Sequence, residues 1–518
     1  ANINGPENTD NGNHCLAMGI STRAIRCVKE SNGFVPEEKP TPDVPADDAV
    51  DLSAAGTANC YIVSAANTEY KFKATVKGNG TTALSGETAD LAPATAAVLW
   101  SVAAITDTKP NEDGGGWPSN LGNSKAATNL ILKNTVELKD NGYIYFKTAE
   151  EMIDGNVIIC AKDAEGNIVW SWHMWVLNGY DAAASEHFVT ASDLNVYMMD
   201  RNLGATASPD RVATPTQNEW TQARGFYYQW GRKDPFMGSC KVVSGYAPKI
   251  VWNTPDGVDS VGYAQYSSKK LLNSINVQDI PGSTDVYTSV AYATAHPMTF
   301  IAGNGDGSYS WVWPNKDVHA PGTTAEWGKL WGNQTGAGAW DKGGVKTMYD
   351  PCPAGYQVPS AGHFRFITSH GDNAGAYYNK LAEWKYNCVE ELFNDAGEAL
   401  NGANNVAPFG LNFYVKGSKT AAEGVADGAQ NRGVAPEDKT TAFFPAQGCI
   451  NWGYSDKTYG NVDVTAHTNQ VREPDFYGFS TLFMKAERKG EFFNNTNSAS
   501  YAEQQAKALP VRCFRNAE

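Results

Sequence analysis

The chain has 518 residues, of which 42% are hydrophobic and only 19% are charged, and its formal net charge is −15. A chain of this length is expected to form about two to four domains with ordinary apolar cores. The acidic balance argues against a nucleic-acid-binding protein, because such proteins need clustered lysine and arginine to meet phosphates.

Targeting and redox signals favour an extracellular or cell-surface location. No apolar stretch is long enough for a transmembrane helix, and no signal peptide opens the chain, so we expect a removed targeting segment or an internal fragment. The nine cysteines are widely spaced and form no CxxC pair, which excludes zinc-ribbon and thioredoxin patterns. Their spacing favours scattered disulfides in an oxidising compartment, with buried free thiols as the alternative.

The first 50 residues form a tail and a linker. Residues 31–50 contain four prolines among acidic side chains, which is typical of an extended linker. Residues 1–30 include Ile25, Arg26, Cys27 and Val28, an order of residue types that returns near the C-terminus in residues 511–514.

This repeat suggests that the tail is the last strand of a second copy of the C-terminal domain. One explanation is that the rest of that copy is missing. The other is that the tail adds as a strand to a neighbouring subunit and so builds a filament. Cys27 then pairs with a cysteine of another chain or, locally, with Cys15.

Residues 51–182 are predicted to form an immunoglobulin-like β-sandwich. Residues 70–76 alternate between apolar and polar with period two, and residues 157–176 read as a hairpin with a glycine-containing turn. Short strands with frequent turns are typical of sandwiches. Trp170, Trp172 and Trp175 are interpreted as core residues, with an aromatic platform for sugars as the alternative.

Residues 183–518 are predicted to be an α+β domain with short strands, long loops and two helices, near residues 360–367 and 379–393. The whole chain is thus expected to be mainly β with some α. Long loops on a small β core usually carry binding function.

Catalytic signatures are missing from the sequence. It contains no HExxH, GxSxG, Walker or GxGxxG pattern, and the neighbouring acids Glu390 and Glu391 are interpreted as solvated helix residues. We therefore expect no enzyme. No cofactor is expected, although residues 304–308 (Asn-Gly-Asp-Gly-Ser) are either a plain turn or a calcium-binding loop.

Four segments carry a family resemblance: residues 197–205, 225–236, 350–360 and 510–514. In order and spacing they resemble the Fibrobacter succinogenes major paralogous domain, which is abundant in secreted proteins of Bacteroidetes. The resemblance implies a C-type-lectin-like fold related to that of the formylglycine-generating enzyme, and export to the cell surface as pilus-tip or adhesion modules.

The resemblance also implies roles for individual residues. The two cysteines that lie in its motifs, Cys352 and Cys513, are expected to form a disulfide. The aromatic motif residues are expected to pack the core, and the motif glycines to permit tight bends. These residues are Tyr227, Trp230, Phe236, Gly225 and Gly231.

Sugar-binding C-type lectins place a Glu-Pro-Asn loop and a following Asn-Asp pair around calcium. The nearest counterparts here are Glu473, Asp475, Asn494 and Asn495, an imperfect match. Aromatic side chains in the same region offer stacking faces for a glycan. They are Trp452, Tyr454, Tyr459 and Tyr477. The alternative is that these loop residues pack on one another.

The sequence therefore predicts an extracellular adhesin or pilus-like filament subunit, which associates with itself or with neighbouring surface subunits. A cell-surface carbohydrate-binding protein is the second interpretation, and a phage fibre or decoration protein is the third. We expect neither a nucleic-acid partner nor a membrane-spanning segment.

Overall fold

The computed structural model describes part of the chain, and all described residues belong to the second of two compact units, Ala1–Asp43 and Val44–Glu518. Strands dominate among them, so the predicted class, mainly β with some α, is confirmed. The described residues are 48–104, 130–191, 194–208, 222–223, 225–236, 249–254, 257–262, 273–303, 310–312, 329–332, 345–359, 363, 410–415, 440–445, 449–452, 459–463, 467–470, 481–483, 500–501, 506 and 508–516.

A small sheet opens the fold. Its strand order is β1-β3-β6-β5, and β3 lies parallel to β1 and antiparallel to β6. In β3 the side chains of Tyr70 and Phe72 are buried while their neighbours are at least partly exposed, which is the period-two pattern of a strand with one covered face. The bounds are β1 (Val50–Asp51), β3 (Glu69–Lys73), β5 (Glu137–Leu138) and β6 (Tyr143–Lys147).

A larger sheet has the order β13-β12-β4-β7-β8-β2. The predicted hairpin is present as β7 and β8, and the carboxylate of Asp163 accepts a hydrogen bond of 2.7 Å from the Asn167 amide in its turn. The bounds are β2 (Cys60–Val63), β4 (Thr95–Ala103), β7 (Gly155–Lys162), β8 (Ile168–Val176), β12 (Lys249–Thr254) and β13 (Gly257–Gly262).

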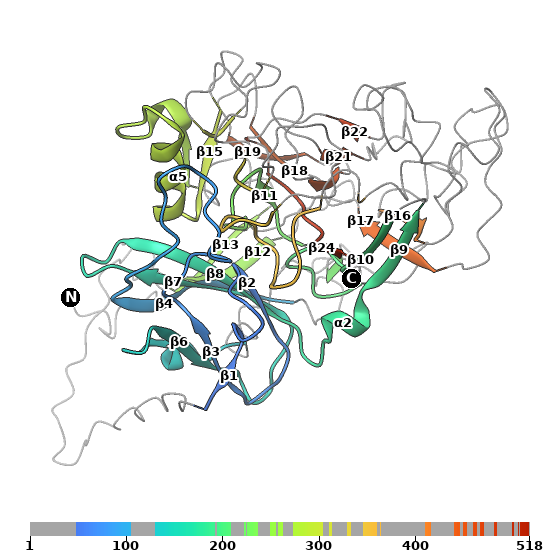
Figure 1. Ribbon diagram of the computed structural model, residues 1–518, viewed down its shortest axis with the longest axis horizontal. Coiled ribbons are helices and arrows are strands. Elements are labelled where there is room, and N and C mark those ends of the chain that lie inside the picture. The colour runs from blue at the N-terminus through green and yellow to red at the C-terminus, as the bar shows by residue number, and fades with distance from the viewer. Residues whose placement is uncertain are drawn as a thin grey trace, which may run out of the picture. The chain divides into compact units, whose positions relative to one another are not determined.

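The two sheets pack face to face, as a β-sandwich requires (Figure 1). The ring of Phe72 in the small sheet meets the ring of Trp172 in the large sheet edge-on, with 5.1 Å between centroids. Among residues 48–104 and 130–181, the only helical element is a single 3-10 turn, η2 (Lys133–Thr135). The described part of this region therefore agrees with the sandwich prediction.

The opposite face of the large sheet is covered by residues that follow position 182. The indole of Trp175 donates a hydrogen bond of 3.0 Å to the Ala205 carbonyl, and the ring of Trp100 packs edge-on against Phe226. Trp170, Trp172 and Trp175 are all buried, so the core interpretation is correct. A strand covered on both faces reads as a nearly continuous apolar run, and between Trp170 and Val176 only Ser171 and His173 interrupt that run.

The hairpin β12–β13 also comes from beyond position 182 and extends the large sheet. It lies antiparallel to β4, with Asn253 opposite Ser101. Nothing in the sequence between residues 51 and 182 indicated this addition, because strand pairing over such a separation leaves no local pattern. The sandwich and the following region thus share one apolar core.

The remaining elements are short. The carboxylate of Asp285 caps the first turn of helix α5 by accepting a hydrogen bond of 2.9 Å from the Thr288 amide. The helical elements are α2 (Ala182–Ser185), η3 (Val277–Asp279) and α5 (Val286–Ala295). The other strands form four small sheets and are β9 (His187–Ala191), β10 (Leu194–Met198), β14 (Asn273–Asn276), β15 (Thr299–Ala302), β16 (Gly410–Tyr414), β17 (Thr441–Pro445), β20 (His467–Gln470), β21 (Thr481–Phe483), β22 (Ser500–Tyr501) and β24 (Phe514–Asn516).

A further four-stranded sheet has the order β11-β23-β18-β19. Its strands are β11 (Tyr228–Gln229), β18 (Cys449–Trp452), β19 (Tyr459–Asp463) and β23 (Ala508–Leu509). The two helices predicted near residues 360–367 and 379–393 lie outside the described residues, apart from His363. The side chain of His363 is buried and meets the ring of Phe514 edge-on.

Gly78 lies where the sandwich touches the segment that contains Cys352. Its φ is +49°, and a methyl group there would lie 2.2 Å from the Met348 carbonyl oxygen. We expect Gly78→Ala to lower the free energy of unfolding by about 3 kcal/mol, because backbone strain and a clash with backbone add together. Chemical denaturation measures the loss.

Gly86 provides the matched control. Its φ is +77°, and no atom lies within 4 Å of a methyl group placed there. Gly86→Ala should lower the free energy of unfolding by only about 1 kcal/mol, because alanine is strained in the left-handed backbone conformation but meets no other atom there. Equal losses for Gly78→Ala and Gly86→Ala would contradict the close contact with Met348.

Candidate functional site

The expected disulfide between Cys352 and Cys513 is present, with an S–S distance of 1.99 Å and 5.8 Å between the Cα atoms. Both residues are fully buried. Beside them, Gln357 and Phe514 exchange two backbone hydrogen bonds of 2.8 and 3.0 Å. We call residues 345–358 and 511–516 together the disulfide clamp, because they fasten the C-terminal strand β24 to the middle of the chain.

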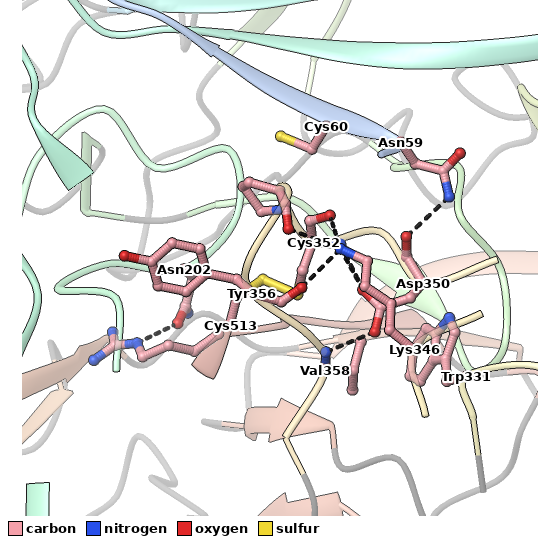
Figure 2. Close-up of a disulfide and its surroundings, with 12 residues drawn as sticks. Asn59, Cys60, Asn202, Trp331, Lys346, Asp350, Cys352, Tyr356, Val358 and Cys513 are labelled. Atoms are coloured by element: carbon pink, nitrogen blue, oxygen red, sulfur yellow. Dashed lines mark hydrogen bonds and ion pairs between the residues drawn. A yellow bond between two sulfur atoms is a disulfide. The ribbon is translucent and has the colours of Figure 1, made fainter. Parts of the chain in front are cut away.

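Two polar side chains organise the clamp (Figure 2). The carboxylate of Asp350 accepts hydrogen bonds of 2.8 Å from the amides of Cys352 and Val358. The side-chain amide of Asn59 donates to the carbonyl oxygens of Met348 and Asp350 at 2.7 and 2.9 Å. Because Asn59 directly precedes strand β2, it ties the clamp to the large sheet.

Arg512 holds the other half of the clamp from inside the fold. Its side chain is buried and donates to the Asn202 side-chain oxygen at 2.9 Å and to the Phe443 carbonyl at 2.8 Å. The guanidinium also lies over the Phe444 ring, 4.0 Å from its centroid. Burial lowers the pKa of Arg512 to about 9, so the side chain still carries its charge at neutral pH.

Arg515 closes the end of strand β24 from the outside. It forms a two-point ion pair with the carboxylate of Glu186 and lies 3.9 Å from the ring centroid of Tyr197. The hydroxyl of Tyr356 donates to the same carboxylate at 2.6 Å. A bidentate arginine–carboxylate pair fixes geometry better than a single contact does.

The motif at residues 225–236 forms a second internal support. Arg232 is buried, and its guanidinium donates to the Thr299 carbonyl at 2.8 Å and points at the last carbonyls of helix α5, including that of His296 at 3.3 Å. A cation at a helix C-terminus is favourable because it meets the negative end of the helix dipole. As the resemblance implied, Tyr227, Trp230 and Phe236 are buried.

Of the two motif glycines, Gly231 has the left-handed backbone of a tight bend, whereas Gly225 is required by close contact with backbone. Gly231 has a φ of +84°, and a methyl group at Gly225 would lie 2.1 Å from the Leu203 carbonyl oxygen. Both positions therefore exclude side chains, one by conformation and close packing and the other by contact with backbone.

Sequence motifs gave no sign of a Cys–His–Asn grouping that the large sheet assembles. The Cys60 sulfur lies 3.5 Å from Nδ1 of His173, and Nε2 of His173 lies 2.8 Å from the side-chain oxygen of Asn156. The three residues come from strands β2, β8 and β7, and only the strand register brings them together. Cysteine nucleophiles are often arranged in this order.

Both Cys60 and His173 are neutral in this grouping, as expected for polar side chains buried in a core. Burial raises the pKa of the Cys60 thiol and lowers the pKa of His173 to about 3. An active cysteine needs the reverse, a thiolate beside an imidazolium. The side-chain amide of Asn156 donates to the Gly204 carbonyl at 3.0 Å, so its oxygen faces Nε2–H and the thiol donates to Nδ1.

A second buried grouping joins Ser171, Lys233 and Asp234. The ammonium of Lys233 lies 2.6 Å from the Ser171 hydroxyl and 2.5 Å from the Asp234 carboxylate, and 4.5 Å from the Trp170 ring centroid. A serine–lysine pair reacts only when the lysine is neutral. Burial lowers the pKa of Lys233, and the adjacent Asp234 carboxylate opposes that shift. By its geometry the lysine is the partner of Asp234 in a buried ion pair.

Only two of the predicted ligand-binding residues, Trp452 and Tyr459, belong to the described part of the chain. Trp452 and Tyr459 lie opposite each other across strands β18 and β19, beside a register shift at Asn451. The other six lie outside the described residues: Tyr454, Tyr477, Glu473, Asp475, Asn494 and Asn495. So do the tail residues Ile25, Arg26, Cys27 and Val28, and the possible calcium-binding loop at 304–308.

Within the described ranges, no three histidine, cysteine, aspartate or glutamate side chains are grouped as metal ligands. In that same part of the chain, no helix has the length and apolarity to span a bilayer. Two of the described cysteines, Cys60 and Cys160, are buried free thiols.

Fold and site together define a mainly β protein whose C-terminal segment is fastened by a buried disulfide, the buried Arg512 and the ion pair of Arg515 with Glu186. No protein-family model, curated protein or solved structure matches the chain.

Proposed function

We propose that this chain is a non-enzymatic extracellular surface protein, an adhesin or a subunit of a pilus-like filament. The observation that carries the proposal is the disulfide clamp, in which a buried disulfide, Arg512 and Arg515 hold the last strand in place. Structural disulfides form and persist in oxidising compartments. The resemblance to surface-exported lectin-like modules points to the same location.

The chemistry of the buried groupings supports a scaffold over an enzyme. Among the described residues, Cys60 and Ser171 are nucleophile types beside a histidine or a lysine. Burial raises the pKa of the Cys60 thiol, and the lysine beside Ser171 is engaged in an ion pair with Asp234. The described motif residues pack or brace the core, so recognition is left to residues outside the motifs. Binding loops on a rigid β scaffold are a common arrangement in adhesive proteins.

The tail supplies the means of assembly in this proposal. In the segment that leads into strand β24, Val511 is buried, Arg512 bonds inside the fold and Cys513 forms the disulfide. Ile25, Arg26 and Cys27 repeat these residue types in the same order. A segment with this chemistry is suited to completing a sheet of a neighbouring subunit by strand addition.

Sedimentation velocity of the full chain and of a chain lacking residues 1–30 tests the proposal. We expect the full chain to form concentration-dependent oligomers and the shortened chain to stay monomeric. Cys27→Ser is the matched control, because it keeps the strand and removes any disulfide between subunits. A shortened chain that assembles as well as the full one would refute strand addition.

A carbohydrate-binding protein of the cell surface is the second candidate. It is favoured by the pairing of Trp452 with Tyr459 across one hairpin, since both were predicted to stack on sugars. Binding of the full chain to a glycan array, lost in Trp452→Ala, would favour this candidate over assembly.

A further inference from the structure

The side chain of Lys346 enters the disulfide clamp and ends among carbonyl groups (Figure 2). Its ammonium donates to the carbonyl oxygens of Cys352, Pro353 and Tyr356 at 2.6, 2.7 and 2.7 Å. An ammonium carries three protons, so each proton has one carbonyl acceptor. The carboxylate of Asp350 lies 3.8 Å from the same nitrogen.

These oxygens would repel one another without a positive charge between them. Three carbonyl dipoles converge on one point, and the Asp350 side chain beside them has no exposed surface. Backbone carbonyls and carboxylates are the ligands that proteins use for hard cations, and rings of carbonyls replace the hydration shell of potassium. The Lys346 side chain retains only 14% of its exposure.

We propose that the turn formed by residues 350–356 is a binding site for a small monovalent cation, which the chain fills with its own Lys346 ammonium. Distances of 2.6 and 2.7 Å suit an ammonium or potassium ion. The site does not depend on glycan binding, because none of its residues belongs to the predicted ligand-binding set.

The internal cation also positions Cys352. Two of its three carbonyl partners belong to Cys352 and the adjacent Pro353, and Asp350 holds the Cys352 amide from the other side. Occupation of the site therefore fixes the backbone that presents Cys352 to Cys513, and an empty site leaves a buried carboxylate without its nearest cation.

Lys346→Ala and Lys346→Met of the full chain test the proposal. Alanine leaves room for an ion, whereas methionine fills the channel with an apolar chain of similar length. The thermal midpoint is measured in ammonium, potassium or choline chloride at equal ionic strength. In choline chloride we expect both variants to unfold at a lower temperature than the natural chain does. As the concentration of ammonium or potassium is raised, the thermal midpoint should increase for Lys346→Ala only.

Three results would overturn the proposal: a midpoint of Lys346→Ala that is equal in the three salts, an equal response of Lys346→Met, or a response to calcium alone. If Lys346→Ala does not fold in choline, refolding from denaturant is followed by the yield of the Cys352–Cys513 disulfide. Ammonium or potassium should then raise that yield for Lys346→Ala, and no increase would again overturn the proposal.

Discussion

Replacing Cys352 and Cys513 together by alanine should lower the free energy of unfolding by about 5 kcal/mol, on the chain-entropy estimate for a loop of this size. The two cysteines are 161 residues apart in sequence, so the crosslink closes a large loop in the unfolded chain. The loss is measured as a lower midpoint in urea or guanidinium unfolding under non-reducing conditions.

Cys160→Ala is the matched control for this variant. Cys160 is as well buried as the paired cysteines, on strand β7, but it is a free thiol. Its loss removes one small side-chain group and should cost about 1 kcal/mol. A double variant that unfolds no earlier than Cys160→Ala would show that the disulfide contributes little to stability.

The disulfide and the hairpin β7–β8 were predictable for different reasons. The hairpin follows from local patterns, an apolar run on each side of a glycine-containing turn. The disulfide came from the family resemblance alone, because nine cysteines allow many pairings and spacing does not choose among them. The alternative of buried free thiols is realised at Cys60 and Cys160.

The shared large sheet could not be predicted from the sequence. In the structure every residue from Trp170 to Val176 is buried, so strand β8 is covered on both faces. Its second cover comes from Ala205 and Phe226, and its extension from strand β12. These contacts depend on tertiary packing between distant segments, for which a single sequence carries no periodic signal.

The buried polar groupings were missed for the same reason. Cys60 and His173 lie side by side only because strand β2 runs parallel to strand β8 in one particular register. Lys346 meets its carbonyls through a turn that the Asp350 carboxylate folds. The sequence did offer one sign of that turn, the acid two residues before Cys352, since aspartate often bonds backbone amides close by.

His173 should make the protein sensitive to mild acid. Its imidazole is buried between Trp175 and Phe226, with hydrogen bonds to Cys60 and Asn156. Burial lowers its pKa to about 3, whereas an unfolded histidine has a pKa of about 6.5. Below about pH 6.5 His173 is protonated in the unfolded chain, whereas in the folded chain it stays neutral until the pH approaches its pKa of about 3.

Stability from this residue is therefore complete at neutral pH and is lost as the pH falls from about 6.5 towards 3. Between pH 7 and pH 4 the loss from His173 alone should be about 3 kcal/mol. Because carboxylates also titrate in this range, the loss is measured against His173→Gln, which is less stable at pH 7 but lacks the histidine proton. Its unfolding free energy should therefore fall less steeply with acid than that of the natural chain.

Parallel pH profiles for the natural chain and His173→Gln would mean that the imidazole is already solvated in the folded state. The neutral network of Cys60, His173 and Asn156 would then be wrong, because only a buried, neutral imidazole accepts the thiol proton at Nδ1 and donates at Nε2 to Asn156.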